Sequence, residues 1–209
     1  MNAIWWPKEY KHRDETRPSF DAKKVISIRL AKMLINLAQA EKEILDPFCG
    51  TGTILQEALL MGYNATGIDI SIRDAKKNVE WLGNQYKRNA KLIQGDATNV
   101  ISTLQSVEAV VTEPYLGPYF KKLPSEDEAK ATVKVLEILY TKFLSALSEK
   151  IKGKVVIIFP RIRTYTKTFS PNIQRILEQT GFSIYTPFPA IPMPMEYEKR
   201  RSKVERDIY

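Results

Sequence analysis

The chain has 209 residues, of which 44% are hydrophobic and 27% charged, a soluble globular composition that fits one α/β domain with or without a small appendage. Cys49 is the only cysteine and His12 the only histidine, so an internal disulfide is excluded, and no apolar run reaches the ~18 residues of a membrane span. The net charge of +8 favours an acidic partner such as nucleic acid, and the single cysteine fits a cytoplasmic protein.

Residues 1–24 are basic and aromatic, and we expect them to form an extended arm before one domain over residues 25–209. A helix is predicted over residues 25–38, because apolar side chains recur there on one face at helical spacing. These side chains are Ile26, Leu30, Met33, Leu34 and Leu37.

From residue 44 onward, apolar runs of strand length alternate with helical patterns. Strands are predicted at residues 44–45, 66–70, 91–94, 109–112, 154–159 and 182–185, and helices at residues 54–60, 74–82, 99–104, 126–150 and 172–179. The inner side of the longest helix is predicted to carry Val133, Val135, Leu136, Leu139, Tyr140, Phe143, Leu144 and Leu147. This alternation predicts an α/β fold with a doubly wound parallel sheet.

The C-terminal third contains three further signals. We expect Pro160 to end the strand before it, because proline cannot donate to a sheet ladder. The proline-rich residues 187–195 are predicted to form a loop, and residues 206–209 a last edge strand.

Candidate binding residues stand at the ends of four predicted strands, the edge where open α/β sheets bind ligands. The first group is the loop at residues 46–53, DPFCGTGT, in which Gly50 and Gly52 permit a tight turn and the close approach of a ligand. It is neither a GxxxxGK[ST] phosphate loop nor a full GxGxxG motif. A plain structural turn is the alternative interpretation of this loop.

Acidic residues follow the next three strands. Asp69 can accept the hydroxyls of a ribose, and Asp96 can accept an adenine amino group, although each is also typical of a helix cap or turn. Residues 112–118, TEPYLGP, place two prolines and a glycine around Glu113 and Tyr115, with a strand-terminating loop as the alternative. The order of the four groups together indicates a ligand site.

The string DPFCGTGTI at residues 46–54 resembles the DPFCGSGT loop of class I RNA methyltransferases. More narrowly, it is similar to the archaeal and eukaryotic enzymes that methylate N2 of guanosine in tRNA, including guanosine at position 10. Arg17-Pro18, residues 30–38 and the basic tail at residues 198–209 are also similar to segments of this family, so the resemblance extends over nearly the whole chain.

The resemblance implies a Rossmann-like class I methyltransferase fold, with a seven-stranded, mostly parallel sheet, helices on both faces and an antiparallel last strand. It implies S-adenosylmethionine as the cofactor, with Asp69 on the ribose and Asp96 on the adenine, and no metal. The residues that we assign to the cofactor are Asp46, Pro47, Phe48, Gly50, Thr51, Gly52, Thr53, Asp69, Ile70, Asp96 and Ala97.

The chain departs from the family in two ways. The amine-binding motif of the family usually reads Asp-Pro-Pro-Tyr before a glycine, whereas this chain has Glu113, Pro114, Tyr115 and Leu116 before Gly117. The family usually carries an N-terminal RNA-binding THUMP domain, for which these 209 residues leave no room. We therefore expect either a catalytic fragment or a protein that depends on a partner subunit or on its own basic surface.

Methylation of an exocyclic base amine requires acceptors that grip the amine protons, since the nitrogen lone pair is delocalised into the ring. Glu113 and the Pro114 carbonyl are the predicted acceptors, and Tyr115, Tyr119 or Phe120 is predicted to stack on a base rotated out of its helix. The predicted RNA contacts are Lys8, Lys11, Arg13, Arg17, Lys121, Lys122, Lys199, Arg200, Arg201 and Lys203. Trp5 and Trp6 are expected to stack on bases or to pack on the domain surface.

Two alternatives stay open on the sequence. A DNA adenine-N6 methyltransferase uses the same cofactor and a similar grip on the amine, but it needs a target-recognition domain. A non-catalytic cofactor-binding RNA-binding module would explain Glu113 and Leu116. Cys49 as a nucleophile is disfavoured, because a cysteine inside the cofactor loop is expected to pack there.

Overall fold

The computed structural model describes residues 7–20, 25–186, 193–197 and 204–209. Its helices are α1 (Pro7–Thr16), α2 (Ile28–Ala38), α3 (Thr53–Leu60), α4 (Arg73–Tyr86), α5 (Ala97–Thr103), α6 (Glu126–Ser148) and α7 (Ile173–Thr180). Its strands are β1 (Glu43–Asp46), β2 (Asn64–Asp69), β3 (Lys91–Gln94), β4 (Val110–Thr112), β5 (Val155–Arg163), β6 (Thr168–Phe169), β7 (Met195–Tyr197) and β8 (Val204–Ile208).

Seven strands form a continuous sheet in the order β3-β2-β1-β4-β5-β8-β7, and the two-residue β6 pairs with β5 beside it. Strands β3, β2, β1, β4 and β5 are parallel, whereas β8 is antiparallel to both of its neighbours. This arrangement confirms the predicted mostly parallel sheet with an antiparallel last strand. The prediction that the last strand lies at the edge is wrong, because β7 covers its outer side.

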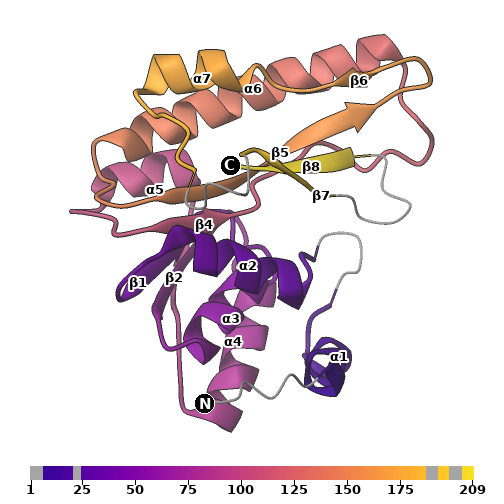
Figure 1. The fold of residues 1–209 in the computed structure, drawn as a ribbon. Helices are drawn as coiled ribbons and strands as arrows, with labels where there is room; N and C mark the ends of the chain where they lie inside the picture. Colours follow the sequence, from indigo (N-terminus) through magenta and orange to yellow (C-terminus); the bar gives the residue numbers. More distant parts are fainter. Residues whose placement is uncertain (1–6, 21–24, 187–192, 198–203) are drawn as a thin grey trace.

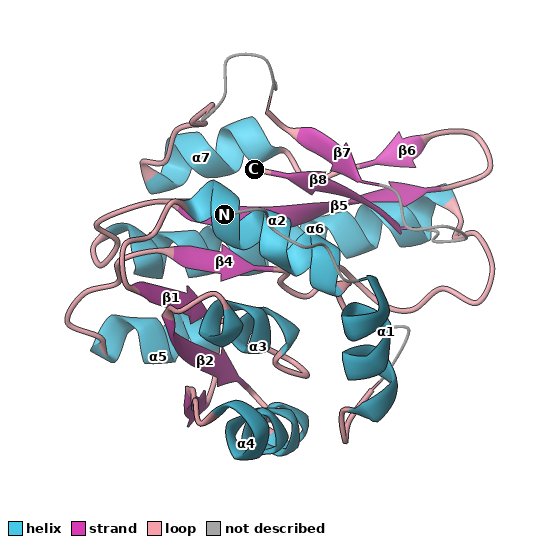
Figure 2. Cartoon of the chain, turned by 60° about the horizontal axis from the view of Figure 1, so that its bottom comes forward, coloured by secondary structure: helices cyan, strands magenta, loops and turns pink. Residues whose placement is uncertain are grey.

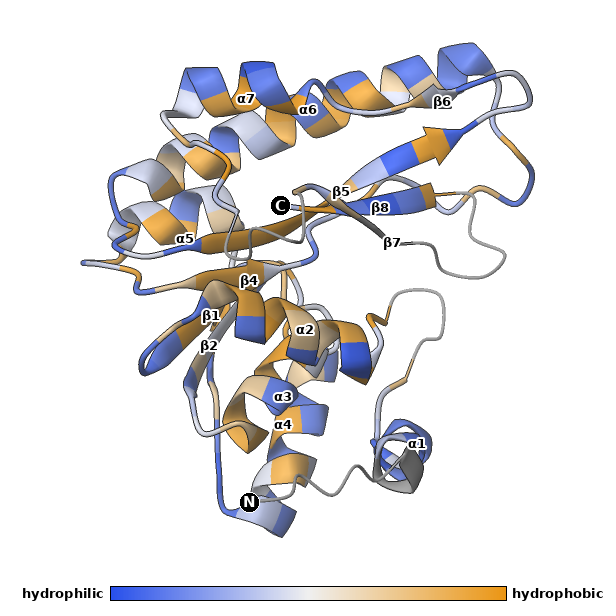
Figure 3. Ribbon diagram, in the orientation of Figure 1, coloured by the Kyte–Doolittle hydropathy of each residue, from blue (hydrophilic) through white to orange (hydrophobic). Residues whose placement is uncertain are grey.

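The sheet lies between two layers of helices, with α2, α3 and α4 on one face and α5, α6 and α7 on the other (Figures 1 and 2). Successive strand residues alternate between the two cores: Ile44 and Val111 pack with α2–α4, while Leu45 and Val110 pack with α5–α7. Figure 3 shows the consequence, since β4 and the first part of β5 are hydrophobic along their length and the helices are polar on their outer sides. Strands buried on both faces are typical of parallel sheets.

Local sequence explains where the two best-defined helices begin. The Ser27 hydroxyl accepts a hydrogen bond from the Leu30 amide and caps α2, and Ser125 and Glu128 form a reciprocal capping box at the start of α6. The apolar faces are largely as predicted. Val135 is an exception, because its side chain is 62% exposed on the outer side of α6.

Two expected segments differ from the structure. Residues 7–16 form α1 rather than an extended arm. Residues 182–186 form no strand, and Ile184 and Tyr185 are exposed there. The position next to β5 is taken by β8 from the tail, so the apolar run at residues 182–185 has no ladder to join in the described part of the chain.

Strand β5 continues through Pro160, contrary to prediction. On the edge of β5 away from β8, pairing with β4 ends at Ile157 and pairing with β6 begins at Ile162. Pro160 lies between them, where this edge has no hydrogen-bonded neighbour strand. A proline costs a strand little at such a position. Within the described residues, no helix is long and apolar enough to cross a membrane.

Candidate functional site

The parallel strands bring their carboxyl ends to one edge of the sheet. The registers Asp46 with Gly67 and Asp69 with Gln94 bring the ends of β1, β2 and β3 together. β4 ends beside them at Thr112, in register with Ile157, and β5 continues past this point to Arg163. The predicted groups at these ends therefore lie along a single edge. Asp69 and Glu113 lie close enough to Asp46 for their charges to add to the effect of burial, which raises the pKa of Asp46.

The loop at residues 46–53 makes the tight turn that its glycines predict. Gly50 and Gly52 have φ angles of 50° and 79°, in the left-handed region that favours glycine. The Gly52 amide donates to the Cys49 carbonyl at 2.7 Å, and the Gly50 amide donates to Asp69 Oδ2 at 2.9 Å. The end of β2 thus helps to hold the loop that follows β1.

Asp46 is 2% exposed and lies beneath this loop. Its Oδ1 accepts hydrogen bonds from the Thr112 hydroxyl at 2.8 Å and from the Phe48 amide at 3.2 Å. Burial raises the pKa of Asp46 to about 7, against the lowering effect of these two donors. Asp46 thus ties β1 to β4 from inside the protein.

β2 ends at the half-buried Asp69, and the exposed Ile70 follows it. Besides the Gly50 amide, the Asp69 carboxylate accepts the Ser71 amide at 3.0 Å through Oδ1. Ile70 directly beside it is 74% exposed. The site therefore presents a fixed carboxylate next to an exposed apolar side chain.

Asp96 follows β3 and caps α5. Its Oδ1 accepts the Thr98 amide at 2.8 Å and the Thr98 hydroxyl at 2.6 Å, and these bonds lower the pKa of the exposed carboxylate. Ala97 is buried in the first turn of α5. The capping role that the sequence allows for Asp96 is present, and it leaves the carboxylate exposed at the sheet edge.

Cys49 is packed inside the loop. Its side chain is 5% exposed, and burial raises the pKa of the thiol well above its usual range. A Cβ on Gly67 would lie 2.9 Å from the Cys49 sulfur, so the glycine in β2 makes room for it. A buried neutral thiol is a poor nucleophile, and this environment supports the packing role.

Glu113 directly follows β4 and is paired with Arg206 of β8. Arg206 Nε donates to Glu113 Oε1, and the two side chains are only 12% and 11% exposed. This ion pair was not predicted. The two residues are 93 positions apart, and only the insertion of β8 beside β5 brings them together.

Residues 112–118, which we call the motif loop, are also held by a contact from α6. The Tyr140 hydroxyl donates to the Tyr115 carbonyl at 2.7 Å, and Gly117 has a φ of 104°. Pro114 is buried, whereas the side chains of Tyr115 and Tyr119 are 53% and 68% exposed. Tyr115 therefore presents an exposed ring two residues after Glu113 on a backbone held by α6, and Tyr119 presents a second exposed ring further along the loop.

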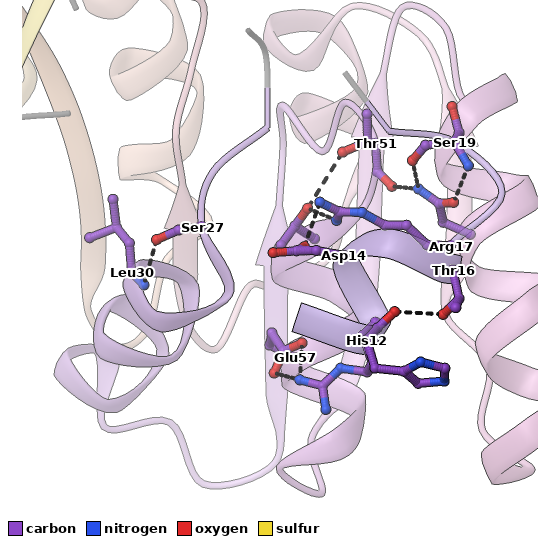
Figure 4. A network of polar contacts seen from close by, with 12 residues as sticks. His12, Asp14, Thr16, Arg17, Ser19, Ser27, Leu30, Thr51 and Glu57 are labelled. Carbon is purple, nitrogen blue, oxygen red and sulfur yellow. Dashed lines mark hydrogen bonds and ion pairs between the residues drawn. The ribbon is translucent and has the colours of Figure 1, made fainter. Parts of the chain in front are cut away.

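A second unpredicted set of contacts links the N-terminal segment to the glycine loop at residues 46–53. Arg17 Nη1 donates to the Thr53 hydroxyl at 2.9 Å, and Asn78 Nδ2 donates to both the Thr51 and Ser19 carbonyls at 2.8 Å. Figure 4 shows Arg17 and Asp14 facing the loop at Thr51. The segment after α1 thus fastens the start of α3.

This packing overturns two of the predicted RNA contacts. Arg17 is 6% exposed and pairs with Asp14 at 2.8 Å, and Arg13 is 5% exposed and pairs with the buried Glu57 at 2.8 Å. Buried guanidiniums engaged in this way cannot reach a phosphate. Their charge is used inside the fold.

The other predicted RNA contacts stay predictions. Lys11, Lys121 and Lys122 are exposed, and the side chain of Lys8 is not described. Lys199, Arg200, Arg201, Lys203, Trp5 and Trp6 lie outside the described residues.

Curated relatives are similar in sequence to much of the chain. It is 33% identical over 158 residues to the tRNA (guanine(10)-N2)-dimethyltransferase of Pyrococcus abyssi, a match over 73% of this chain and 44% of that protein. The chain spans less than half the length of the curated relatives it matches.

Solved structures share the fold. TrmN from Thermus thermophilus superposes with a TM-score of 0.59 at 17% identity, over 90% of this chain and 50% of that one. A candidate RNA methyltransferase from Pyrococcus horikoshii gives a TM-score of 0.58 at 21% identity, over 98% and 97% of the two chains. The model of the family described as the RMKL-like methyltransferase domain (UPF0020) matches residues 16–182. This match covers the glycine loop, the loop after β4 and both layers of helices, and the chain belongs to this family of methyltransferase domains.

Proposed function

We propose that this chain binds S-adenosylmethionine at the ends of β1, β2 and β3 and transfers its methyl group to N2 of a guanosine in tRNA. The observation that carries the proposal is the fixed carboxylate of Glu113 at the end of β4, beside the glycine loop. The name of the Pyrococcus abyssi relative, a tRNA (guanine(10)-N2)-dimethyltransferase, supports the choice of substrate.

The residues at the ends of β2 and β3 fit an adenosine. Its ribose hydroxyls and its amino group are donors, and the carboxylates of the half-buried Asp69 and the exposed Asp96 are acceptors. The 74% exposed side chain of Ile70 lies between them in sequence and offers an apolar surface for a base. The positive φ angles of Gly50 and Gly52 give the loop between β1 and α3 its tight turn.

At the motif loop, the chain supplies acceptors for an amine. Bound S-adenosylmethionine supplies an electrophilic methyl group on a sulfonium. Glu113 and the Pro114 carbonyl accept the amine protons, which favours a tetrahedral nitrogen and holds it in line for transfer. The exposed rings of Tyr115 and Tyr119 are the candidates to stack on the base.

The proposal is tested by methyl transfer from labelled S-adenosylmethionine to unmodified tRNA, ribosomal RNA and DNA, followed by mass identification of the modified nucleoside. We expect N2-methylated or N2,N2-dimethylated guanosine in tRNA. Methylated adenine in DNA would replace this function with the adenine-N6 alternative.

Two further results of that experiment have a defined meaning. A chain that transfers no methyl group but melts at a higher temperature with the cofactor is a non-catalytic cofactor-binding module, because a ligand that binds only the native state stabilises it. A chain that shows neither transfer nor stabilisation does not use this cofactor.

A further inference from the structure

Arg206 lies in β8, which is hydrogen-bonded on both sides. Its backbone is in register with Pro160 of β5 and with Tyr197 of β7. From this inner strand the Arg206 guanidinium donates through Nε to Glu113 Oε1. A side chain from the tail therefore ends at the motif loop, two strands away in the sheet.

We propose that Arg206 is a positioning residue that holds Glu113 Oε1, so that Glu113 Oε2 is turned to the target amine. The proposal rests on the function proposed above. It divides the carboxylate between a structural partner and a substrate partner, one oxygen for each.

The electrostatic surroundings of Glu113 explain why it needs a cation. The carboxylate is 11% exposed and lies near the buried carboxyl of Asp46. A buried anion is costly unless a positive group is paired with it. Arg206, itself 12% exposed, supplies that charge from the opposite side of the motif loop.

The length of the glutamate side chain fits the same role. Glutamate has one more rotatable bond than aspartate, and holding it in a single rotamer costs conformational entropy. A planar guanidinium anchored in a strand fixes the position of one carboxylate oxygen better than a flexible ammonium. An aspartate at position 113 would be shorter by one C–C bond, about 1.5 Å, and would not reach both Arg206 and the amine.

The neighbouring strand offers a matched control. Arg161 of β5 pairs with Glu205 at 3.4 Å and with Asp207 at 3.2 Å, the residues on either side of Arg206. These two ion pairs tie β8 to β5 without involving Glu113. Loss of the Arg161 charge therefore weakens the same pair of strands but leaves the motif loop intact.

The experiment is a double-mutant cycle on methyl transfer to tRNA by the full chain. The variants are Arg206→Gln, Arg206→Lys, Glu113→Gln, the double variant Glu113→Gln/Arg206→Gln, and Arg161→Gln. For each variant, kcat, the KM for tRNA, the Kd for S-adenosylmethionine and the melting temperature are measured.

Arg206→Gln is expected to lower kcat by roughly 10- to 100-fold, the range seen when a group that orients a site ligand is removed. Its KM for tRNA and its Kd for the cofactor should stay near wild type. Arg206→Lys should recover part of kcat, since it keeps the charge without the planar fork. In the Glu113→Gln background, Arg206→Gln should lower kcat little further, because the effects of replacing two residues that act together are not additive.

Arg161→Gln should lower the melting temperature and leave kcat unchanged. The proposal is overturned by wild-type or raised kcat in Arg206→Gln, by an equal loss in the Glu113→Gln background, or by the same loss in Arg161→Gln. Should Arg206→Gln not fold, the cycle is repeated with Arg206→Lys and the double variant Glu113→Gln/Arg206→Lys. The proposal is then overturned if Arg206→Lys has the kcat of wild type and its effect on kcat is the same in the Glu113→Gln background. A wild-type chain that methylates no nucleic acid removes the proposed function itself, which is a different result.

Discussion

Two carboxylates at the carboxyl edge of the sheet have opposite environments. Glu113 is paired with a guanidinium, whereas Asp46 is buried and, in the described part of the chain, hydrogen-bonded to a hydroxyl and an amide. A paired carboxylate suits a fixed acceptor for an amine. The Asp46 carboxyl, with its pKa raised to about 7 by burial, suits a structural link between β1 and β4.

Replacing Glu113 tests the acceptor role. Glu113→Gln keeps the shape but substitutes a donor for one acceptor oxygen, so turnover should fall about 100-fold or more, the scale for loss of one aligned polar group in a transition state. The Kd for the cofactor should barely change. Glu113→Asp should also lose activity, because the shorter side chain cannot span Arg206 and the amine.

Steady-state kinetics and calorimetry on both variants provide the check. Near-normal turnover in both would mean that Glu113 is an ordinary loop acid. Loss of cofactor binding in Glu113→Gln would place the residue in the cofactor pocket instead.

Replacing Asp46 tests the raised pKa. The folded chain holds a proton on Asp46 up to about pH 7, whereas an ordinary aspartate has a pKa of 3.8. Between these values the native state binds more protons than the unfolded state, so this group makes the wild type less stable as pH rises. Relative to Asp46→Asn, the wild type should lose stability between about pH 4 and pH 7, by up to about 4 kcal/mol.

Urea unfolding of both proteins at several pH values measures this difference. The Thr112 hydroxyl can still donate to an asparagine oxygen, so the variant keeps its link to β4. Parallel stability curves for the two proteins would contradict the raised pKa.

At the level of elements, α1 and the residues after it act as a clamp on the start of α3. Arg13 pairs with Glu57 in α3, and Arg17 bonds to Thr53 in its first turn. Asn78 joins the same loop to α4 and to Ser19. The glycine loop and the start of α3 are therefore supported from α1, from the segment after it and from α4.

Arg17→Met should weaken cofactor binding without affecting RNA binding. Loss of a hydrogen bond to a charged donor at Thr53 loosens the loop, so the Kd for S-adenosylmethionine should rise roughly tenfold. Lys11→Met is the control, because Lys11 lies in the preceding helix with its side chain 77% exposed. Calorimetry should find its Kd unchanged.

The salt dependence of tRNA binding provides a second check on Arg17. A buried guanidinium contacts no phosphate, so the slope of log K against log salt should be the same in Arg17→Met and in wild type. A reduced slope would return Arg17 to the RNA-binding surface.

At the level of the whole molecule, we expect charge and shape to direct an acidic substrate to one edge of the sheet. The chain carries a net charge of +8, and the glycine loop and the motif loop both open at the carboxyl edge of the sheet. The basic tail at residues 199–203 leads directly into β8, whose Arg206 reaches that edge. We therefore expect the tail to bind phosphates near the site.

Four glutamine substitutions in the tail test this expectation. The quadruple variant replaces Lys199, Arg200, Arg201 and Lys203. It should have a lower affinity for tRNA, and the slope of log K against log salt should be smaller by roughly 0.7–0.9 for each phosphate that the tail no longer neutralises. The control variant removes an equal number of positive charges from the opposite, amino edge of the sheet. Its substitutions are at the exposed Lys42, Lys87, Arg88 and Lys91.

Binding assays across a series of salt concentrations should separate the two quadruple variants. A tail variant with the slope of wild type, or a control variant with an equal loss, would remove the tail from the RNA-binding surface.

The sequence by itself determined the alternating elements and the order of the site groups. The turn at Gly50 and Gly52, the strands before Asp46 and Asp69, and the apolar face of α6 follow from local spacing and backbone preference. Such features depend on residues a few positions apart, so a single sequence reveals them.

Only the tertiary structure decided what the charged residues do. Arg13 and Arg17 have the same sequence signature as surface arginines, and Arg206 has that of a basic tail. Their partners Glu57, Thr53 and Glu113 are 44, 36 and 93 positions away. Whether a guanidinium meets solvent, a phosphate or a buried carboxylate depends on which strands and helices become neighbours, and that is set by the packing of the whole sheet.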